Sequence, residues 1–262
     1  MNFVSEPRER IYSIRKKVNQ AMMSFAHSCR HISALIVSLV LVTSTFSISP
    51  GNPEKKLNKT LAMIPKFIAF QFKKPSGLFG IFSSNLMVKR NQKNYDRLIK
   101  DLNLQSQDKI LEIGYGPGVG IRMIAELNSS CTIHGIDFSK LMYKIATKNN
   151  KEYIDAGRMK LHYGDFLKTS ALDNNYDKVF CLNVIYFWDE LKSPFEKVLS
   201  LLRKGGTFHI YMADQNTLVK MKAPDSVFNK YSIGEVVEAL EAAGFENIVH
   251  YSEKGLYIKA RK

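Results

Sequence analysis

The chain has 262 residues, of which 45% are hydrophobic, and a formal net charge of +14 at pH 7. This length allows one large domain with a sizeable core, or one domain with an N-terminal attachment. The 3 cysteines, Cys29, Cys131 and Cys181, offer neither a paired framework nor a Cys-x-x-Cys spacing. Structural disulfides and a structural zinc site are therefore not expected.

The positive charge is concentrated before residue 110. Residues 51–109 contain 12 lysines or arginines against 4 acidic residues, whereas residues 110–262 contain 20 against 18. A basic segment of this kind can bind nucleic acid or lie against anionic lipid headgroups, where each Lys or Arg is worth about 1 kcal/mol. We favour the membrane surface because of the sequence that precedes the segment.

Residues 1–60 are expected to form a basic leader. Within it, residues 32–49 (ISALIVSLVLVTSTFSIS) carry no charge. Since a bilayer-spanning helix needs about 17–25 apolar residues, this stretch suffices for a single N-terminal membrane anchor, which is the localisation we favour. A cleaved signal peptide, an organelle-targeting leader and a buried or disordered segment remain alternatives. Basic residues on both flanks leave the membrane orientation open.

Residues 61–105 are expected to form a basic, aromatic cap. The stretch 61–91 is rich in Phe, Met and Lys. Four turn-forming residues interrupt it: Pro65, Pro75, Gly77 and Gly80. Their spacing argues against one long helix. An interfacial membrane segment fits the composition, and so does a helical cap that packs on the main domain.

From residue 91 onward, strands and helices are expected to alternate, as in a parallel sheet that is covered by helices. The expected strands lie near 109–113, 131–136, 159–163, 176–182, 206–212, 245–250 and 255–260. The expected helices lie near 91–102, 119–128, 139–156, 189–202 and 232–243. The pattern predicts an α/β domain over residues 106–262.

A glycine cluster follows the first expected strand, in KILEIGYGPGVG (109–120). Gly114, Gly116 and Gly118 let the backbone turn tightly and approach a ligand, and the next helix offers its N–H groups to negative charge. The spacing is Gly-x-Gly-x-Gly. The dinucleotide fingerprint Gly-x-Gly-x-x-Gly would need glycine at position 119, where the chain has Val119.

Acidic residues end the next two expected strands. In CTIHGIDFS, Asp137 can accept hydrogen bonds from two vicinal ribose hydroxyls, although a loop aspartate or a helix cap is the alternative. In HYGDF, Asp165 can lie beside an adenine amino group and Phe166 near its ring, although Gly-Asp alone is an ordinary turn. The glycine cluster, Asp137 and Asp165 follow three successive expected strands in order. Together they indicate a common binding site and not three ordinary turns.

These motifs resemble those of the class I S-adenosylmethionine-dependent methyltransferases, particularly the small-molecule branch that includes ubiquinone and menaquinone C-methylases. YDKVFCLNVIYFWDE, LLRKGGTFHIYM and AAGFENIVHY…GLYIKAR extend the resemblance over about residues 90–262. It implies S-adenosylmethionine as the cofactor. It also implies the Rossmann-like methyltransferase fold, a seven-stranded, mostly parallel, doubly wound sheet with a reversed final hairpin.

The resemblance also implies positions for the cofactor. The methionine end would be held by the glycine loop, which Glu112 would organise from below: Glu112, Gly114, Tyr115, Gly116 and Gly118. Ribose and adenine would be bound at the next two strand ends: Asp137, Phe138, Asp165 and Phe166. Asn183 would lie beneath the sulfonium and face the substrate. Tyr115 departs from the family, in which this position is often small or Cys.

Methyl transfer from a sulfonium is an in-line displacement, so positioning can supply roughly 7–11 kcal/mol without a dedicated base. A cation favours aromatic faces, and we predict Asn183, Tyr186 and Trp188 as the catalytic residues. Members of the run 186–188 could instead pack beneath the next helix, which Asp189 is expected to cap.

Several absences narrow the substrate. NVIY lacks the prolines of the DNA amino-methyltransferase motif, Cys181 lacks the Pro-Cys loop of cytosine C5 enzymes, and no metal-ligand spacing is present. We predict methyl transfer to a small, lipophilic acceptor, with no nucleic-acid partner and no metal. The alternatives are an RNA or protein methyltransferase and a catalytically silent cofactor-binding scaffold. The sequence fixes neither the acceptor nor the oligomeric state.

Overall fold

The structure is a computed structural model that describes Lys73 and residues 91–221, 223–253 and 255–262. All of these belong to the unit Leu61–Lys262. The expected leader 1–60 with its anchor 32–49, and most of the expected cap up to residue 90, lie outside the described residues. In the part that is described, no helix has both the length and the apolar character that crossing a bilayer requires.

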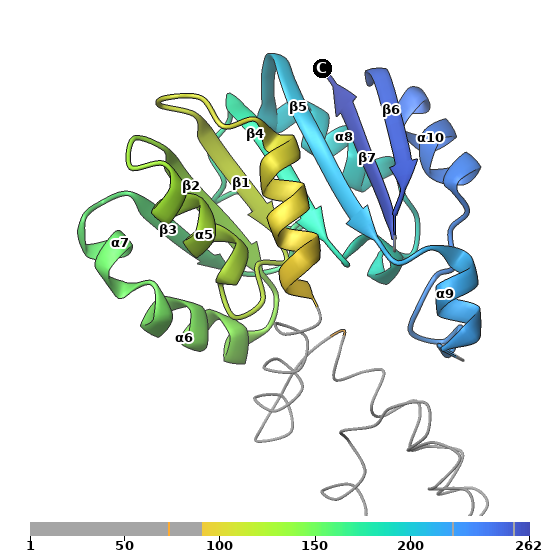
Figure 1. Cartoon of the computed structure of the whole chain (residues 1–262), viewed down its shortest axis with the longest axis horizontal. Coiled ribbons are helices and arrows are strands. Elements are labelled where there is room, and N and C mark those ends of the chain that lie inside the picture. Colours follow the sequence, from red (N-terminus) through yellow and green to blue (C-terminus); the bar gives the residue numbers. More distant parts are fainter. Residues whose placement is uncertain (1–72, 74–90, 222, 254) are drawn as a thin grey trace, which may run out of the picture. The chain divides into compact units, whose positions relative to one another are not determined.

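The described residues form one seven-stranded sheet in the order β3-β2-β1-β4-β5-β7-β6 (Figure 1). The strands are β1 Lys109–Ile113, β2 Thr132–Asp137, β3 Met159–Tyr163, β4 Tyr176–Leu182, β5 Leu202–Met212, β6 Glu246–Ser252 and β7 Leu256–Arg261. The first five strands pair in parallel, and β7 runs antiparallel to both β5 and β6. The predicted mostly parallel sheet with a reversed final hairpin is confirmed.

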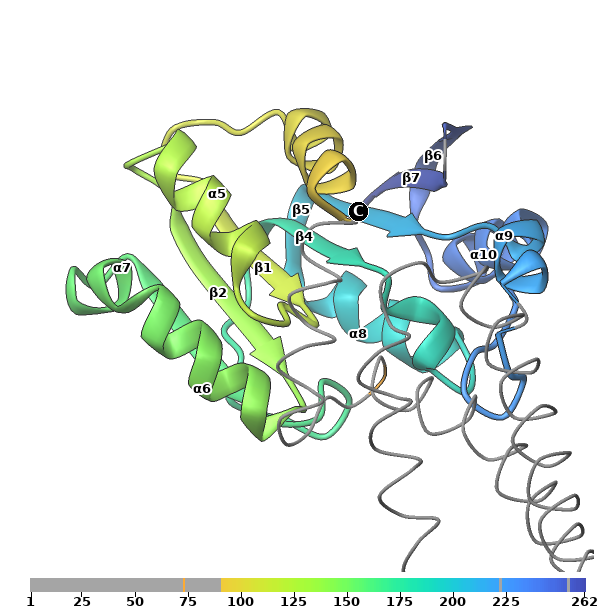
Figure 2. The same cartoon turned by 60° about the horizontal axis from the view of Figure 1, so that its bottom comes forward.

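Helices cover both faces of the sheet (Figure 2). The described helices are residues 91–102, α5 Val119–Leu127, α6 Lys140–Asn149, α7 Lys151–Asp155, α8 Lys192–Leu201, α9 Gln215–Lys220 and α10 Ile233–Ala242. The helix at 91–102, α5 and α6 pack on one face, in a cluster with buried side chains of β1 and β2. The helices α8 and α10 pack on the other face.

The central strands are buried on both sides, as expected for a parallel sheet between helices. In β4, for example, Val179 and Cys181 join the cluster on one face, whereas Phe180 and Leu182 join the cluster on the other. Side chains alternate along a strand, so one apolar run supplies both cores. The rigid sheet places the carboxyl ends of β1 to β5 along one edge.

Three elements differ from the sequence prediction. The single helix expected over 139–156 is interrupted at Asn150, whose buried side-chain amide donates to the carbonyl of Gly118 at 3.3 Å and that of Ala146 at 2.9 Å. The short helix α9 was not predicted, although Asp214 caps it by accepting from the N–H of Thr217 at 2.7 Å. The strand β5 begins four residues earlier than expected because Leu202 pairs with Tyr176.

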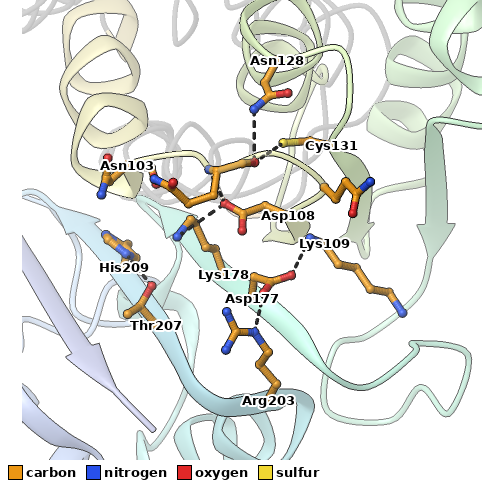
Figure 3. A network of polar contacts seen from close by, with 12 residues as sticks. Asn103, Asp108, Lys109, Asn128, Cys131, Asp177, Lys178, Arg203, Thr207 and His209 are labelled. Atoms are coloured by element: carbon orange, nitrogen blue, oxygen red, sulfur yellow. Dashed lines mark hydrogen bonds and ion pairs between the residues drawn. The ribbon is translucent and has the colours of Figure 1, made fainter.

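A polar network pins the opposite edge of the sheet, where the parallel strands begin (Figure 3). Asp177 Oδ2 accepts from the N–H of Lys109 at 2.8 Å, and its other oxygen pairs with Arg203. Asp108 Oδ2 lies 3.5 Å from Lys178 Nζ. These contacts join β1, β4 and β5 far from the carboxyl edge, so we assign the network to the fold.

Candidate cofactor and methyl-transfer site

A cavity of about 320 Å³ lies at the carboxyl edge of the parallel strands. This volume falls within the roughly 300–1,000 Å³ of small-molecule sites. Its walls come from the segments that follow β1, β2, β3 and β4. They are lined by Lys73, Ile113, Gly114, Gly116, Pro117, Ile136, Asp137, Phe138, Met142, Gly164, Asp165, Phe166, Leu167, Leu182, Asn183, Val184, Phe187, Trp188 and Asp189.

The three glycines of the loop have different reasons to be glycine. All have positive φ, of 73°, 54° and 83° for Gly114, Gly116 and Gly118. A Cβ on Gly118 would come within 2.5 Å of the Asn150 side chain, and one on Gly114 within 2.5 Å of Val184. A Cβ on Gly116 would meet no atom within 4 Å. Gly116 therefore faces open space in the cavity wall, whereas Gly118 does not line the cavity and serves helix packing.

Asp137 ends β2 and closes the loop from the side. Its Oδ2 accepts from the N–H of Gly116 at 2.9 Å and its Oδ1 from the N–H of Ser139 at 2.7 Å. Burial raises the pKa of Asp137 to about 6, although both backbone bonds oppose the shift. The carboxylate lines the cavity and retains lone pairs for further donors. Its assignment to ribose stays a prediction.

Glu112 lies beneath the loop, outside the cavity lining. It is fully buried in β1, where its Oε1 accepts from the hydroxyl of Tyr95 at 3.2 Å. A Cβ on Gly120 would approach Oε2 to 2.8 Å, so the first turn of α5 packs directly on the carboxyl group. Burial raises the pKa of Glu112 to about 8. This position suits the predicted support of the loop from below.

The side chain of Tyr115 turns away from the cavity. It is fully buried, its hydroxyl donates to the carbonyl of His162 at 3.0 Å, and its ring lies against Gly135. Burial raises the pKa of this hydroxyl. The side chain of Tyr115 therefore does not line the cavity, and the predicted contact of Tyr115 with the cofactor stays a prediction for its backbone. The bulky residue is tolerated because Gly135 of β2 leaves room for its ring.

The loop after β3 holds both predicted adenine residues. Asp165 is exposed, and its Oδ1 accepts from the N–H of Leu167 at 2.9 Å. Phe166 is buried and its ring stacks on that of Trp188, with centroids 6.1 Å apart and an interplanar angle of 26°. Phe138 lies in the cavity wall with both. The three side chains are brought together, and adenine recognition stays a prediction.

Asn183 follows β4 with a positive φ of 61°, a region in which Asn is enriched. Its N–H donates to the carbonyl of Tyr211 at 2.8 Å, and its Nδ2 donates to Asn91 Oδ1 at 3.1 Å. Its Oδ1 is buried and has no hydrogen-bond partner within the described part of the chain. The amide thus leaves a buried acceptor at the cavity, a state that is costly unless a ligand supplies a donor.

The aromatic run after Asn183 divides between cavity and core. Phe187 and Trp188 line the cavity. Tyr186 does not, because its buried ring packs against Phe228 with centroids 5.3 Å apart. The structure thus places Tyr186, which the sequence predicted as a catalytic residue, in the core outside the cavity lining, as the packing alternative expects.

Other contacts were not foreseen. Glu190, rather than Asp189, accepts from the N–H of Ser193 near the start of α8, and Asp189 lines the cavity. Asn91 holds the amide of Asn183 from the helix at 91–102. Lys73, from the expected basic cap, lines the cavity. The contact between Asn91 and Asn183 could not be found from spacing, because the two residues are 92 positions apart, whereas Glu190 and Ser193 are three apart.

A second cavity, of about 660 Å³, lies between the helix at 91–102 and the hairpin β6–β7. Arg97 pairs with Glu253 across it, and Tyr251 donates to Asp101. It has neither a glycine loop nor the strand ends of the parallel sheet. We therefore place the site in the smaller cavity.

Comparison with known proteins addresses what the smaller cavity binds. Residues 110–206, which contain the loop, Asp137, Asp165 and Asn183, match the family model described as a methyltransferase domain. These residues form a methyltransferase domain, as the resemblance to the class I S-adenosylmethionine-dependent methyltransferases predicts. Within the described residues, no group of three or more His, Cys, Asp or Glu side chains could hold a metal ion.

Two curated relatives and one solved structure illustrate the similarity. The uncharacterized methyltransferase YdaC of Bacillus subtilis is 27% identical over 62% of this chain and 85% of its own length. The sterol 24-C-methyltransferase ERG6 of Saccharomyces cerevisiae is 25% identical over 56% of this chain and 41% of its own length. A solved structure of Haemonchus contortus phosphoethanolamine N-methyltransferase 2 with S-adenosylmethionine covers 61% of this chain and 38% of its own, with 20% identity and a TM-score of 0.53.

The cofactor of this methyltransferase is S-adenosylmethionine, and the site fits it on three observations. Gly116 leaves space in the wall, Asn183 offers a buried acceptor without a partner, and Asp137 and Asp165 place acceptors at two further strand ends. The ubiquinone and menaquinone branch stays a prediction, since the substrates that these names give are a sterol and phosphoethanolamine.

Proposed function

We propose that this methyltransferase transfers the methyl group of S-adenosylmethionine to a small, lipophilic acceptor. One observation carries the proposal: the polar cradle of Gly116, Asp137 and Asn183 opens into the same cavity as the apolar and aromatic side chains of Val184, Phe187, Trp188 and Leu167. A cofactor in the cradle would therefore meet its acceptor against an apolar wall.

Each part of the cradle has a task that its chemistry suits. Asp137 accepts from hydroxyl donors, Asp165 from an amino donor, and Asn183 Oδ1 from a donor near the end of β4. When bound, S-adenosylmethionine would supply a methyl group on its sulfonium, with S-adenosylhomocysteine as the leaving group. The faces of Phe187 and Trp188 attract a cation.

The chain contributes to the reaction by aligning the cofactor with the acceptor. Alignment of two reactants in one site is worth roughly 7–11 kcal/mol of barrier, so no dedicated base is required. Asp189 is an exposed carboxylate in the cavity lining. It could accept a proton from an acceptor whose nucleophile carries one, whereas Tyr186 has no access to the cavity.

The lipophilic part of the proposal has separate support. One relative is named for sterols, and the cavity wall beyond the cradle is apolar. We propose that the basic cap delivers the acceptor from a membrane surface and that residues 32–49 anchor the chain there. Lys73, which belongs to the basic cap, lines the cavity.

The first test is cofactor binding to the full chain by calorimetry, with S-adenosylmethionine and NAD titrated separately. We expect the sulfonium cofactor to bind and NAD not to bind. Asp137→Asn, which keeps the side-chain shape, should weaken binding by about 10- to 100-fold, because a carboxylate accepts charge-assisted hydrogen bonds. Asp155→Asn, at an exposed carboxylate of α7, is the matched control and should bind as the native chain does.

The second test identifies the acceptor class. The full chain is incubated with S-adenosylmethionine carrying a labelled methyl group and with membrane lipid extract, RNA or protein extract in parallel. Label in the organic phase supports a lipophilic acceptor. Label in RNA or protein, or cofactor binding without label in any fraction, would overturn that proposal and would select a macromolecular enzyme or a silent scaffold.

A further inference from the structure

Lys197 reaches from α8 to the loop that follows β3. Its Nζ donates to the carbonyl of Thr169 at 2.7 Å and to that of Leu167 at 3.2 Å. The same ammonium lies 5.3 Å from the ring centroid of Phe166. The Lys197 side chain thus contacts Phe166, Leu167 and Thr169, all in the loop that carries the predicted adenine residues.

The loop also has contacts of its own, and they are short in range. Asp165 accepts from the N–H of Leu167 through its side chain and from the N–H groups of Lys168 and Thr169 through its carbonyl. These bonds shape the turn but do not attach it to the rest of the domain. The attachment comes from Lys197, from the stacking of Phe166 on Trp188, and from the N–H of Gly164, which donates to the carbonyl of Asp137 at 3.0 Å.

The half-buried position of Lys197 carries a desolvation cost for its ammonium group. Its side chain is half-buried, and burial lowers its pKa, while the charge of Asp165 opposes that shift. Desolvating an ammonium is unfavourable unless hydrogen bonds replace the lost water. Two carbonyls and an aromatic face replace it here.

We propose that Lys197 is a positioning residue that fixes the loop 164–169 against α8, so that Asp165 can select adenine over other purines. The inference rests on the proposed function, because it assumes that the adenine of the cofactor lies at Asp165. It goes beyond that function by naming a residue outside the cavity lining that sets the specificity of the cavity.

The test uses two product analogues with the full chain. S-adenosylhomocysteine carries the adenine amino group, whereas S-inosylhomocysteine has a carbonyl oxygen in its place. Trp188 is the single tryptophan of the chain and lines the cavity, so its fluorescence can report binding of either analogue. The variants are Lys197→Met, which keeps the apolar stem, and Lys197→Arg, which keeps the charge.

We expect Lys197→Met to weaken S-adenosylhomocysteine by about tenfold and S-inosylhomocysteine by much less, so that the preference for adenine falls. Lys197→Arg should restore most of the preference. Lys192→Met is the matched control, since Lys192 lies on the same helix and its ammonium is 3.9 Å from Glu196 at the surface. It should leave both affinities unchanged.

Three results would overturn the inference. Equal losses for both analogues in Lys197→Met would mean that Lys197 only supports the fold, and so would a failure of Lys197→Arg to rescue a stable variant. An unchanged preference in Lys197→Met would mean that the loop holds itself. Absence of binding in the native chain would instead refute the proposed function, which separates the two failures. Thermal melting of each variant identifies any that does not fold.

Discussion

Aspartates lie both where the parallel strands begin and where they end, but the charges around them differ. At the edge where the strands begin, Asp177 accepts from the N–H of Lys109 and pairs with Arg203, while Asp108 lies beside Lys178. At the carboxyl edge, Asp137 accepts two backbone N–H bonds, and within the described residues it forms no ion pair.

The pKa shifts follow this difference. Burial would raise the pKa of Asp177, but the bonds from Lys109 and Arg203 outweigh it and lower the value. Burial prevails at Asp137, where the pKa rises to about 6. Nearby, Asn183 Oδ1 has no partner among the described residues. Carboxylates that hold the fold are neutralised by the chain, whereas the polar groups of the site are left to be completed by a ligand.

The largest effect is expected at the edge that serves the fold. Lys178→Met removes the partner of Asp108, and both side chains are mostly buried, at 14% and 6% exposed. Breaking such a pair should lower the free energy of unfolding by about 3 kcal/mol, measured by urea denaturation. The affinity for S-adenosylhomocysteine should not change.

Two further variants sharpen this prediction. Lys204→Met, at an exposed position of the neighbouring strand β5, should be neutral. The double variant Lys178→Met with Asp108→Asn should be less destabilised than the sum of its parts, because both charges are gone. A loss of cofactor affinity in Lys178→Met that matches its loss of stability would contradict the separation of the two edges.

The next largest effect divides the glycine loop itself. Gly118→Ala places a methyl group against Asn150 and Ala146 at a positive φ and should destabilise the fold by about 2 kcal/mol. Gly116→Ala meets no neighbour, so it should cost about 1 kcal/mol of strain. Gly116→Ala should nevertheless lose more cofactor affinity, because its methyl group enters the cavity. Calorimetry and urea denaturation on both variants decide the order, and a reversed order would refute our assignment of the two glycines.

The smallest expected effect is a change in stability per pH unit, and it concerns Glu112, which lies in β1 beneath the loop. Its pKa rises from the ordinary 4.5 to about 8 on folding. A raised pKa means that the folded state holds the proton more tightly, so this stabilising contribution is complete below pH 4.5 and is lost as the pH rises through 8. In the native chain this loss lowers the free energy of unfolding by up to about 1.4 kcal/mol per pH unit, and Glu112→Gln should abolish it.

Urea midpoints at pH 5, 6, 7 and 8 measure this slope. Glu238→Gln, at an exposed position of α10, is the control and should keep the slope of the native chain. A slope that is identical in native chain and Glu112→Gln would show that the carboxyl group is not buried as described.

Local patterns in the sequence predicted where the strands, the glycine loop and the acidic strand ends lie along the chain. Apolar runs located the strands, Gly114, Gly116 and Gly118 located the loop, and the acids at 137 and 165 located two strand ends. These features depend on neighbouring residues, since backbone conformation and side-chain alternation are local. The resemblance to methyltransferases added the seven-stranded, mostly parallel sheet with its reversed final hairpin, which the pairing of the strands confirms.

The tertiary structure decided which side chains meet. Tyr115 and Tyr186 looked like site residues in sequence, yet packing against Gly135 and Phe228 buries them away from the cavity. Lys197 had no motif, yet α8 brings its ammonium to the carbonyl of Thr169, 28 residues earlier in the chain. Such contacts depend on how helices pack across the sheet, a free energy summed over distant residues. The sequence by itself therefore determined the elements and the kind of site, and only the folded chain determined which residues build it.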